Sequence, residues 1–290
     1  MAAAVQRVQR WRWRDGAWES QPADVAVEMA VTVFVNGQEF ITVAMTPDAV
    51  AEWAIGFLTS EGLIRHPDEV TVLDWWPEEG QVWVRIPGLP RDALAQFGRR
   101  VLSACCGRGR AGVYFSADAD LVEPVPVHEA SVGVDDIVRL TGLLGQRSRR
   151  EPSGGLHMAA LALPPWQEVE ALYTDVGRHN ALDKVWGFAL RRKLPLAGGI
   201  VVFSGRLSSE VLLKVIKMRC GVIVAHGAPT SLGLALADTY GVTAIGFARE
   251  DGFSVYTHPE RMAVRSALTQ DAGTRALPFP VGDPSPPAGP

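Results

Sequence analysis

Short apolar segments alternate with helical patterns through the second half of this 290-residue chain, and this alternation most constrains the fold. Strands that alternate with helices are typical of a largely parallel sheet with helices on both faces. The apolar segments are residues 155–163, 169–175, 199–204, 222–226 and 242–248, and the helical patterns between the later ones lie near residues 181–192, 208–219 and 229–240. The sequence therefore predicts an α/β domain in residues 126–263.

The first half is β-rich with one strong helix. Residues 31–35 and 40–44 flank Asn36-Gly37, the dipeptide that favours a tight hairpin turn, and residues 70–74 and 81–86 form a second predicted strand pair. Between them, Thr46 is expected to cap a helix that has Pro47 at its first position and ends at Gly62. Its predicted buried stripe comprises Val50, Trp53, Ala54, Phe57 and Leu58.

These patterns predict a smaller β-rich α+β domain over residues 20–125, so that the chain is α/β in class and α+β overall. Residues 272–290 are rich in Pro, Gly and Ala and have no periodicity, and a disordered tail is predicted over residues 264–290.

Polar turns follow three of the predicted strands. Ligands bind beyond the carboxyl ends of the strands in an open α/β sheet, and the N–H groups at a helix start attract anions. The three turns are Asp175-Val-Gly-Arg178-His179-Asn180, Ser204-Gly205-Arg206-Leu-Ser208 and His226-Gly227-Ala228-Pro229-Thr230. Each precedes a helical pattern, so together they predict an anion pocket of the size that a nucleotide diphosphate needs. The alternative is that these arginines and histidines are only solvated loop residues.

The run from Tyr173 to Lys184 carries the densest group of functional side chains. Asn180 is predicted as an N-cap, with Asp183 three residues later in a capping-box-like position. Arg178 offers a fork that matches phosphate geometry. A well-capped surface helix is the simpler interpretation. His157, after Gly154-Gly155, lies before the first strand of the domain, where a structural histidine is more common than a catalyst.

Two adjacent thiols, Cys105 and Cys106, lie in the glycine-rich segment Leu102-Ser-Ala-Cys-Cys-Gly-Arg-Gly-Arg-Ala-Gly112. Arg108 and Arg110 follow them, and nearby cations favour thiolate over thiol. An accessible thiolate suits covalent carriage of a group, such as sulfur held as a persulfide. Two buried cysteines beside a solvated basic turn are the alternative.

Composition excludes several classes of function. The formal net charge of −4 argues against nucleic-acid binding, and no apolar stretch reaches the ~18–20 residues of a membrane span. The N-terminus lacks the apolar core of a secretory signal, and three cysteines cannot build a disulfide framework, so we expect a cytoplasmic protein with no membrane or nucleic-acid partner. Zinc motifs are absent and no metal site is predicted, while Cys220 is expected to be a small buried hydrophobe.

Several of these motifs resemble the FdhD family, the formate dehydrogenase accessory sulfurtransferases, over roughly residues 25–262. The run Asp175-Val-Gly-Arg-His-Asn-Ala-Leu-Asp-Lys184 is similar to the signature of that family without a change. The other similar motifs are Ala54-Ile-Gly-Phe-Leu-Thr-Ser-Glu-Gly62, Gly154-Gly-Leu-His157, Ser204-Gly-Arg-Leu-Ser-Ser-Glu210 with Lys214, Ala228-Pro-Thr-Ser231, and Gly246-Phe-Ala-Arg249 leading to Val255-Tyr-Thr-His-Pro-Glu-Arg261.

The resemblance implies a homodimer with a C-terminal cytidine-deaminase-like, three-layer αβα domain that lacks zinc. It implies that sulfur passes as a cysteine persulfide from a cysteine desulfurase to the molybdenum or tungsten bis-guanine-dinucleotide cofactor of formate dehydrogenase, and that the cofactor pocket binds GDP-like nucleotides. The residues implied to hold that cofactor are His157, Asp175, Arg178, His179, Asn180, Lys184, Ser204, Arg206, Lys214 and Thr230, and Cys105 and Cys106 are the implied catalytic residues.

The chain departs from the family at the thiols. Many members have Cys-Gly-x-Cys-Gly, whereas this chain has Cys105-Cys106-Gly107-Arg108-Gly109, so the two-residue spacing between cysteines is lost. Either thiol could carry the sulfur, and Cys105 is preferred. His226 stands where the family often has another basic residue. Two other functions stay open: a chaperone that delivers the cofactor without sulfur chemistry, and a deaminase or nucleotide hydrolase, which the missing metal ligands oppose.

Overall fold

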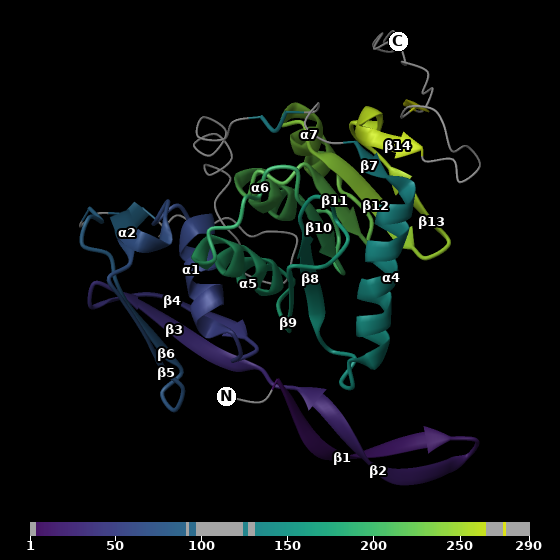
Figure 1. The fold of residues 1–290 in the computed structure, drawn as a ribbon. Coiled ribbons are helices and arrows are strands. Elements are labelled where there is room, and N and C mark those ends of the chain that lie inside the picture. The colour runs from purple at the N-terminus through teal and green to yellow at the C-terminus, as the bar shows by residue number, and fades with distance from the viewer. Residues whose placement is uncertain (1–3, 91–92, 97–123, 127–130, 265–274, 277–290) are drawn as a thin grey trace, which may run out of the picture.

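The computed structural model describes residues 4–90, 93–96, 124–126, 131–264 and 275–276, and it arranges them in four sheets with helices packed on the two larger ones (Figure 1). The largest sheet has six strands in the order β13-β12-β11-β10-β8-β9. These strands are β8 (His157–Ala162), β9 (Ala171–Asp175), β10 (Ile200–Phe203), β11 (Val222–Ala225), β12 (Thr243–Arg249) and β13 (Gly252–Val255). Five of the six lie within two residues of the predicted apolar segments.

The prediction of a largely parallel sheet is wrong for three of the five strand pairs. Strands β10, β11 and β12 are parallel, but β8 pairs antiparallel with both β10 and β9, and β13 pairs antiparallel with β12. The links from β8 to β9 and from β12 to β13 contain no helix, and a short link without a crossover can join only antiparallel neighbours. The sheet is therefore mixed, with its parallel strands in the centre.

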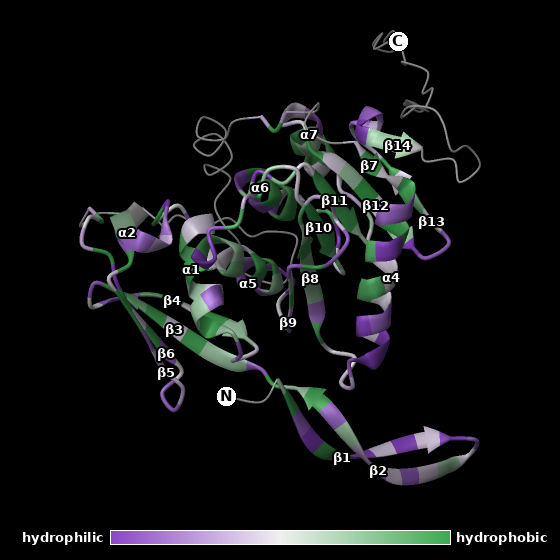
Figure 2. Ribbon diagram, in the orientation of Figure 1, coloured by the Kyte–Doolittle hydropathy of each residue, from purple (hydrophilic) through white to green (hydrophobic). Residues whose placement is uncertain are grey.

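Helices cover both faces of this sheet, as predicted. One face packs against α5 (Arg178–Arg191), α6 (Ser209–Lys217) and α7 (Ser231–Thr239), and the other packs against α4 (Val134–Arg150). Alternate strand residues serve the two faces: Val201 and Phe203 face the three helices, whereas Ile200 and Val202 face α4. Figure 2 shows β10 and β11 as hydrophobic throughout. Because both faces are buried, the strand sequences are apolar runs.

A second sheet is built from the N-terminal part of the chain. Its strands are β3 (Met29–Val35), β4 (Gln38–Met45), β5 (Val72–Trp76) and β6 (Gln81–Arg85), in the order β4-β3-β6-β5. The hairpin at Asn36-Gly37 is confirmed, since both residues have positive φ, 51° and 85°. Helix α1 (Val50–Ser60) covers one face of this sheet, and its predicted stripe of Val50, Trp53, Ala54, Phe57 and Leu58 is buried.

The predicted start of α1 is wrong by several residues. The helix begins at Val50 after Ala49, which has a left-handed conformation, and Thr46 makes no helix cap. Thr46 instead contacts the start of α5, as described below. The stop at Gly62 agrees with the prediction, because Gly62 has a φ of 76° and donates its N–H to the carbonyl of Thr59.

Several elements were not anticipated from the sequence. Strands β1 (Val5–Arg14) and β2 (Ala17–Ala26) form a separate two-stranded ribbon, and β7 (Val132–Gly133), β14 (Met262–Val264) and β15 (Arg275–Ala276) form a small third sheet. The remaining elements are α2 (Ala93–Gln96), η1 (Pro67–Glu69) and η2 (Pro259–Arg261). The predicted domain boundary near residue 125 and the predicted disordered tail of residues 264–290 lie largely outside the described residues. Both therefore remain predictions.

Helices α1 and α5 cross with their backbones in contact, and this crossing joins the two larger sheets. A methyl group added at Gly56 would overlap the carbonyl of Asp183, and one added at Gly187 would overlap the carbonyl of Glu52. Only glycine at both positions lets the two helices approach this closely. The salt bridge between Arg191 and Glu52 lies at the edge of the same crossing.

Replacing Gly187 by Ala should destabilise the protein by more than about 3 kcal/mol, because the helices must separate and disturb both cores to admit the methyl group. Urea unfolding followed by circular dichroism measures this loss. Gly88→Ala is the matched control, since a Cβ there meets no atom within 4 Å. Equal stability of the two variants would contradict the proposed role of the crossing.

Candidate functional site

The carboxyl ends of the central strands meet at one edge of the six-stranded sheet, where the predicted pocket residues gather. The turns after β10 and β11 pair with each other: Gly227 donates its N–H to the carbonyl of Gly205, and Leu207 donates to that of Ala228. Because β8 runs antiparallel to β10, its first residue, His157, lies at the same edge, directly opposite Asp175 at the end of β9. The convergence predicted from strand ends is confirmed for these segments.

Glycines allow the turns to approach one another. A Cβ at Gly227 would lie 2.6 Å from the carbonyl oxygen of Gly205 and 2.9 Å from the backbone of Arg206. A Cβ at Gly205 would lie 2.7 Å from the ring of Phe203 and 3.2 Å from Cδ of Arg178. The second distance places the Arg178 side chain over the turn that follows β10, although Arg178 itself belongs to α5.

Arg178 is the most unusual side chain at this edge. Its Nε and Nη2 atoms are buried and contact no hydrogen-bond acceptor within the described part of the chain. Two buried guanidinium nitrogens without a partner are costly unless an anion pairs with them. Arg178 and Gly177 also begin the 14-residue helix α5, whose N–H groups and dipole favour negative charge at the same place. This arrangement suits a phosphate or another oxyanion.

His157 lies beside Arg178 in a half-buried position. Its Nδ1 is 3.3 Å from Oγ of Ser204, which accepts a hydrogen bond of 2.8 Å from the N–H of Met158. Burial lowers the pKa of His157, and the charges of Arg178 and His179 lower it further. His157 is therefore neutral at pH 7 and can donate or accept one hydrogen bond without adding charge.

A second arginine–histidine pair borders the edge on the side of β12. Arg249 donates from Nη1 to the carbonyl of His226 at 2.9 Å. Burial, followed by the charge of Arg249, lowers the pKa of His226. Nearby, Nε2 of His179 lies 3.2 Å from a carboxylate oxygen of Glu210, at the first turn of α6. Arginine and histidine side chains thus border this edge, and Glu210 is the acidic neighbour of His179.

Other predicted pocket residues lie inward from this edge and join α5 to the N-terminal segment. Lys184 is fully buried, and its ammonium contacts Asp175 at 2.7 Å, Asp48 at 2.5 Å and the carbonyls of Thr46 and Thr174. Burial raises the pKa of Asp175, an effect that Lys184 and several hydrogen bonds oppose. All three ammonium protons have acceptors. Lys184 therefore joins α5 to the end of β9 and to the segment between β4 and α1. A role for it in cofactor binding stays a prediction.

Asn180 is also an internal residue, and its prediction as an N-cap is wrong. The helix begins two residues earlier, with Gly177 as the cap. The Asn180 amide donates to the carbonyl of Ala44 and to Asp175, and its oxygen accepts from Nε1 of Trp53 at 3.3 Å. The amide therefore fastens the start of α5 to the N-terminal segment.

Thr46 completes this junction. Its N–H donates to Asp175 at 3.1 Å, and its hydroxyl accepts from the N–H of Val176 at 3.2 Å. Sequence reasoning assigned Thr46 to α1 because Thr-Pro is a common helix start. The actual partners are about 130 residues away, and no local pattern could have revealed them.

The last predicted residues take different positions. Lys214 of α6 forms a salt bridge with the buried Asp183 and a hydrogen bond of 2.9 Å with Ser60 of α1, so it ties three helices together. Thr230 caps α7 by accepting the N–H of Gly233, and Arg206 is exposed at the turn between β10 and α6. Of the ten predicted binding residues, His157, Arg178, His179, Ser204, Arg206 and Thr230 thus lie in or beside the pocket turns.

Cys105, Cys106 and the arginines around them lie outside the described residues. Cys220 is fully buried, and burial raises the pKa of its thiol to about 12, which agrees with its prediction as a buried hydrophobe. Among the residues that the structure describes, no group of three His, Cys, Asp or Glu side chains could hold a metal ion. No helix in the same residues is both long and apolar enough to cross a membrane.

Comparisons with known proteins agree on one family. The sequence profile described as the FdhD/NarQ family matches residues 26–263. Relatives named "Sulfur carrier protein FdhD" are 40% identical over 256 residues in Geobacillus kaustophilus and 39% identical over 262 residues in Shouchella clausii. These alignments cover 87% and 89% of this chain and 95% and 97% of the relatives.

A solved structure shows the same fold. The crystal structure assigned to a formate dehydrogenase accessory protein from Desulfotalea psychrophila has a TM-score of 0.71 and 22% sequence identity to this chain. The superposition covers 90% of this chain and 100% of the other.

Replacing Arg178 by Gln should raise the pKa of His157, because it removes a positive charge that disfavours the imidazolium. A pH titration of the histidine ring carbon signals by NMR measures this change. Arg249→Gln is the matched control: it should raise the pKa of His226 and leave that of His157 unchanged. If the pKa of His157 were the same in Arg178→Gln and in the unmodified protein, the charge of Arg178 would not act on His157 and the electrostatic description of this edge would be wrong.

Proposed function

Because this chain belongs to the FdhD/NarQ family, we propose that it is a sulfur carrier that serves a formate dehydrogenase. We further propose that it acts as a sulfurtransferase and that its cargo is a molybdenum or tungsten bis-guanine-dinucleotide cofactor. The observation that supports the second part is the guanidinium of Arg178, which has two buried nitrogens available to an oxyanion at the meeting point of three turns.

The pyrophosphate groups of such a cargo match the chemistry of this edge. Arg178 can pair with phosphate oxygens in a forked geometry, and the N–H groups at the start of α5 can donate to the same anion. Ser204 and the neutral His157 add short-range donors, while His179, Arg206 and Thr230 lie on the neighbouring turns. A free GDP-like nucleotide has the same diphosphate and is the natural probe of this site.

Sulfur transfer in this proposal uses the vicinal thiols. A thiolate of Cys105, or of Cys106 as the alternative, attacks the outer sulfur of the desulfurase persulfide, and the desulfurase leaves as a thiolate. The S–S bond of the resulting persulfide would then break, the cysteine would keep the bonding pair as thiolate, and the released sulfur atom would pass to the cofactor. The metal of that cofactor, which is the substrate of the step, would supply the two electrons that reduce the sulfur to sulfide. Arg108 and Arg110 are positioned in sequence to stabilise that negative charge.

This role requires several partners. Sulfur comes from a cysteine desulfurase, and the sulfurated cofactor goes to the catalytic subunit of formate dehydrogenase, both in the cytoplasm. We also propose that the carrier is a homodimer. A delivery chaperone without sulfur chemistry is the second candidate, because the spacing between the family cysteines is lost at Cys105-Cys106.

Incubation with a cysteine desulfurase and cysteine should add one sulfur to the peptide that contains Cys105 and Cys106, as read by mass spectrometry under non-reducing conditions. Replacing the carrier thiol by Ala should abolish the addition, and the single variants Cys105→Ala and Cys106→Ala show which thiol carries the sulfur. Cys220→Ala is the control, since this buried thiol should not take part. Full formate dehydrogenase activity with the double variant would favour the delivery chaperone.

Arg178→Ala should weaken GDP binding roughly 10- to 100-fold, the effect expected for the loss of charge-assisted hydrogen bonds to a phosphate. Isothermal titration calorimetry measures the affinity. Arg192→Ala is the matched control, because Arg192 lies at the opposite end of α5, where its guanidinium packs on the ring of Phe188. Equal GDP affinities of Arg178→Ala and the unmodified protein would exclude this edge as the phosphate site.

A further inference from the structure

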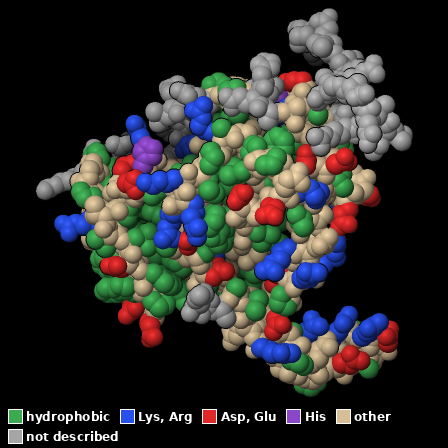
Figure 3. Space-filling view, in the orientation of Figure 1, with side chains coloured by type: hydrophobic (Ala, Val, Ile, Leu, Met, Phe, Trp, Pro, Cys, Tyr) green, Lys and Arg blue, Asp and Glu red, His purple; other side chains and the backbone are tan. Residues whose placement is uncertain are grey.

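Thr46 is a fully buried residue at the place where the N-terminal part of the chain meets the start of α5. It follows Met45, the last residue of β4, whose pairing with Met29 of β3 fixes it to the four-stranded sheet. Figure 3 shows the N-terminal part and the larger α/β part as one continuous body, with the ribbon of β1 and β2 projecting from it. Thr46 is therefore anchored in one part of this body and contacts the other.

The polar groups of Thr46 bind to α5 and to the residues just before it. The hydroxyl accepts the N–H of Val176 at 3.2 Å, and the N–H of Thr46 donates to Oδ2 of Asp175 at 3.1 Å. The carbonyl accepts the ammonium of Lys184 at 3.1 Å. A threonine before a proline is typical of the start of the next helix. Here its polar groups instead bind residues that lie 129 to 138 positions later in the chain.

These bonds hold the backbone immediately before Arg178. The N–H of Val176 is held by the Thr46 hydroxyl, and the N–H of Gly177 donates to Oδ1 of Asp175 at 2.8 Å. The carboxylate of Asp175 is in turn held by the N–H of Thr46. Thr46 therefore acts on the chain before Arg178 in two ways, directly through Val176 and indirectly through Asp175.

The position of Arg178 matters because forked pairing with a phosphate depends on geometry. Nε and Nη2 of Arg178 are buried and have no acceptor among the described residues. Its Cδ lies only 3.2 Å from the position that a Cβ at Gly205 would take, so the side chain fits closely over the turn after β10. A small shift of residues 176 and 177 would move these nitrogens away from an anion at this edge.

We propose that Thr46 is a positioning residue for the anion, because its hydroxyl fixes the peptide of Val176 and thereby the guanidinium of Arg178. The inference rests on the phosphate site proposed above, and it adds that the N-terminal part of the chain sets the affinity of that site. Thr46 is fully buried and acts through Arg178 without touching the anion. A threonine with a merely structural role would stabilise the fold and leave anion binding unchanged.

Thr46→Val tests this role, because it keeps the shape of the side chain and removes the acceptor of the Val176 N–H. The affinity for GDP, measured by isothermal titration calorimetry, should fall roughly 5- to 20-fold, since a binding group is displaced but not removed. Thr46→Ser keeps the hydroxyl and should bind GDP as the unmodified protein does. In the Arg178→Ala background, Thr46→Val should cause no further loss, because the group that it positions is gone.

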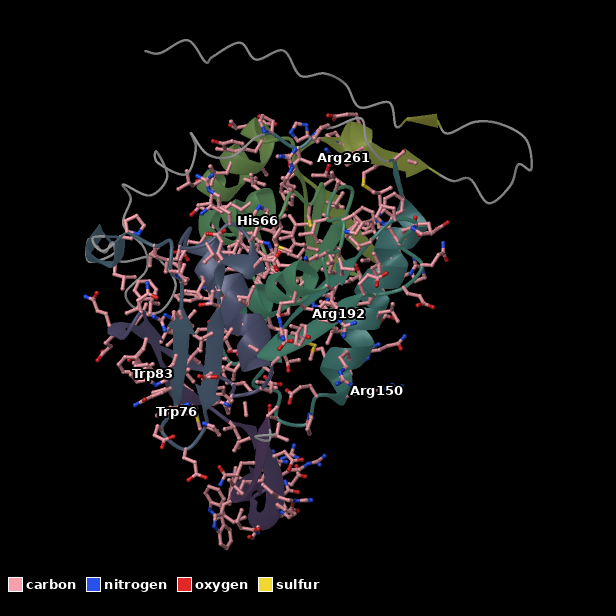
Figure 4. The ribbon with its side chains drawn as sticks, turned by 60° about the vertical axis from the view of Figure 1, so that its left-hand side comes forward. His66, Trp76, Trp83, Arg150, Arg192 and Arg261 are labelled. Carbon is pink, nitrogen blue, oxygen red and sulfur yellow. The ribbon has the colours of Figure 1, made fainter. Side chains whose placement is uncertain are left out.

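Thr257 offers the matched control. It is also a buried threonine whose hydroxyl accepts a backbone N–H, that of Ala244, at 2.9 Å. It lies at the opposite edge of the six-stranded sheet, where Arg261, labelled in Figure 4, donates to the carbonyls of Gly221 and Gly241 just before β11 and β12. Thr257→Val should therefore destabilise the protein and leave the affinity for GDP unchanged.

The pKa of His157 reports the position of Arg178 without any nucleotide. Burial lowers this pKa, and the charges of Arg178 and His179, both in the first turn of α5, lower it further. Thr46→Val releases that turn, so the pKa of His157 should rise in an NMR titration of its ring signals. The pKa should be unchanged in Thr46→Ser and in Thr257→Val. Circular dichroism checks that each variant is folded, and Thr46→Ala, which also lacks the hydroxyl, replaces Thr46→Val if the latter does not fold.

The outcomes separate the positioning role from the phosphate site itself. Weaker GDP binding in Thr46→Val, with no loss in Thr257→Val or in the Arg178→Ala background, supports the inference. An unchanged affinity in Thr46→Val overturns it, and so does an equal loss in Thr46→Val and Thr257→Val. If the unmodified protein bound no GDP, the phosphate site would be wrong. The pKa of His157 would then decide alone: a rise in Thr46→Val would support the positioning of Arg178, and an unchanged value would overturn it.

Discussion

The contact between α1 and α5 is the constraint on which the rest of the structure depends. Gly56 and Gly187 bring the two helix backbones together, and Lys184 lies a turn away with its ammonium enclosed by oxygens from both halves of the chain. Neither feature tolerates a change in the distance between the helices. A looser crossing would leave the charges of Lys184 and Asp175 in the interior without full compensation. The same crossing therefore sets the position of the four-stranded sheet and that of the first turn of α5.

That first turn belongs to both the interior and the pocket. Asp175 and Asn180 face inward and are held by Thr46, Ala44 and Trp53, while Arg178 and His179 between them face the sheet edge. The four polar residues of the run 175–180 are thus divided between two tasks by the helical turn. The inward residues keep the backbone of α5 in place. The outward residues can then present positive charge at a defined position beside the turn that follows β10.

Much of this arrangement could be predicted from the sequence because its signals are local. Apolar runs located the six-stranded sheet, Asn36-Gly37 located a hairpin, and glycine-rich turns located the pocket edge. Strand direction was misjudged, since a run such as residues 155–163 has the same composition in either direction. The inward roles of Asn180 and Lys184 could not be predicted, because the partners that draw them inward, Ala44 and Thr46 among them, are more than 100 residues distant in the chain. The ribbon of β1 and β2 was missed although tryptophan and arginine alternate in residues 10–14, because neither strand has a fully buried face and the apolar runs that mark the other strands are absent from it.

The long separation between α1 and α5 bears on how the protein is made. During synthesis, residues 50–60 leave the ribosome well before residues 178–191, yet the side of α1 at Gly56 packs against α5. Contacts between distant segments form late and slow the folding of a chain. The apolar side of α1 near Gly56 must therefore remain uncovered while more than a hundred further residues are added, so the nascent N-terminal half is a natural substrate for a chaperone at the ribosome exit.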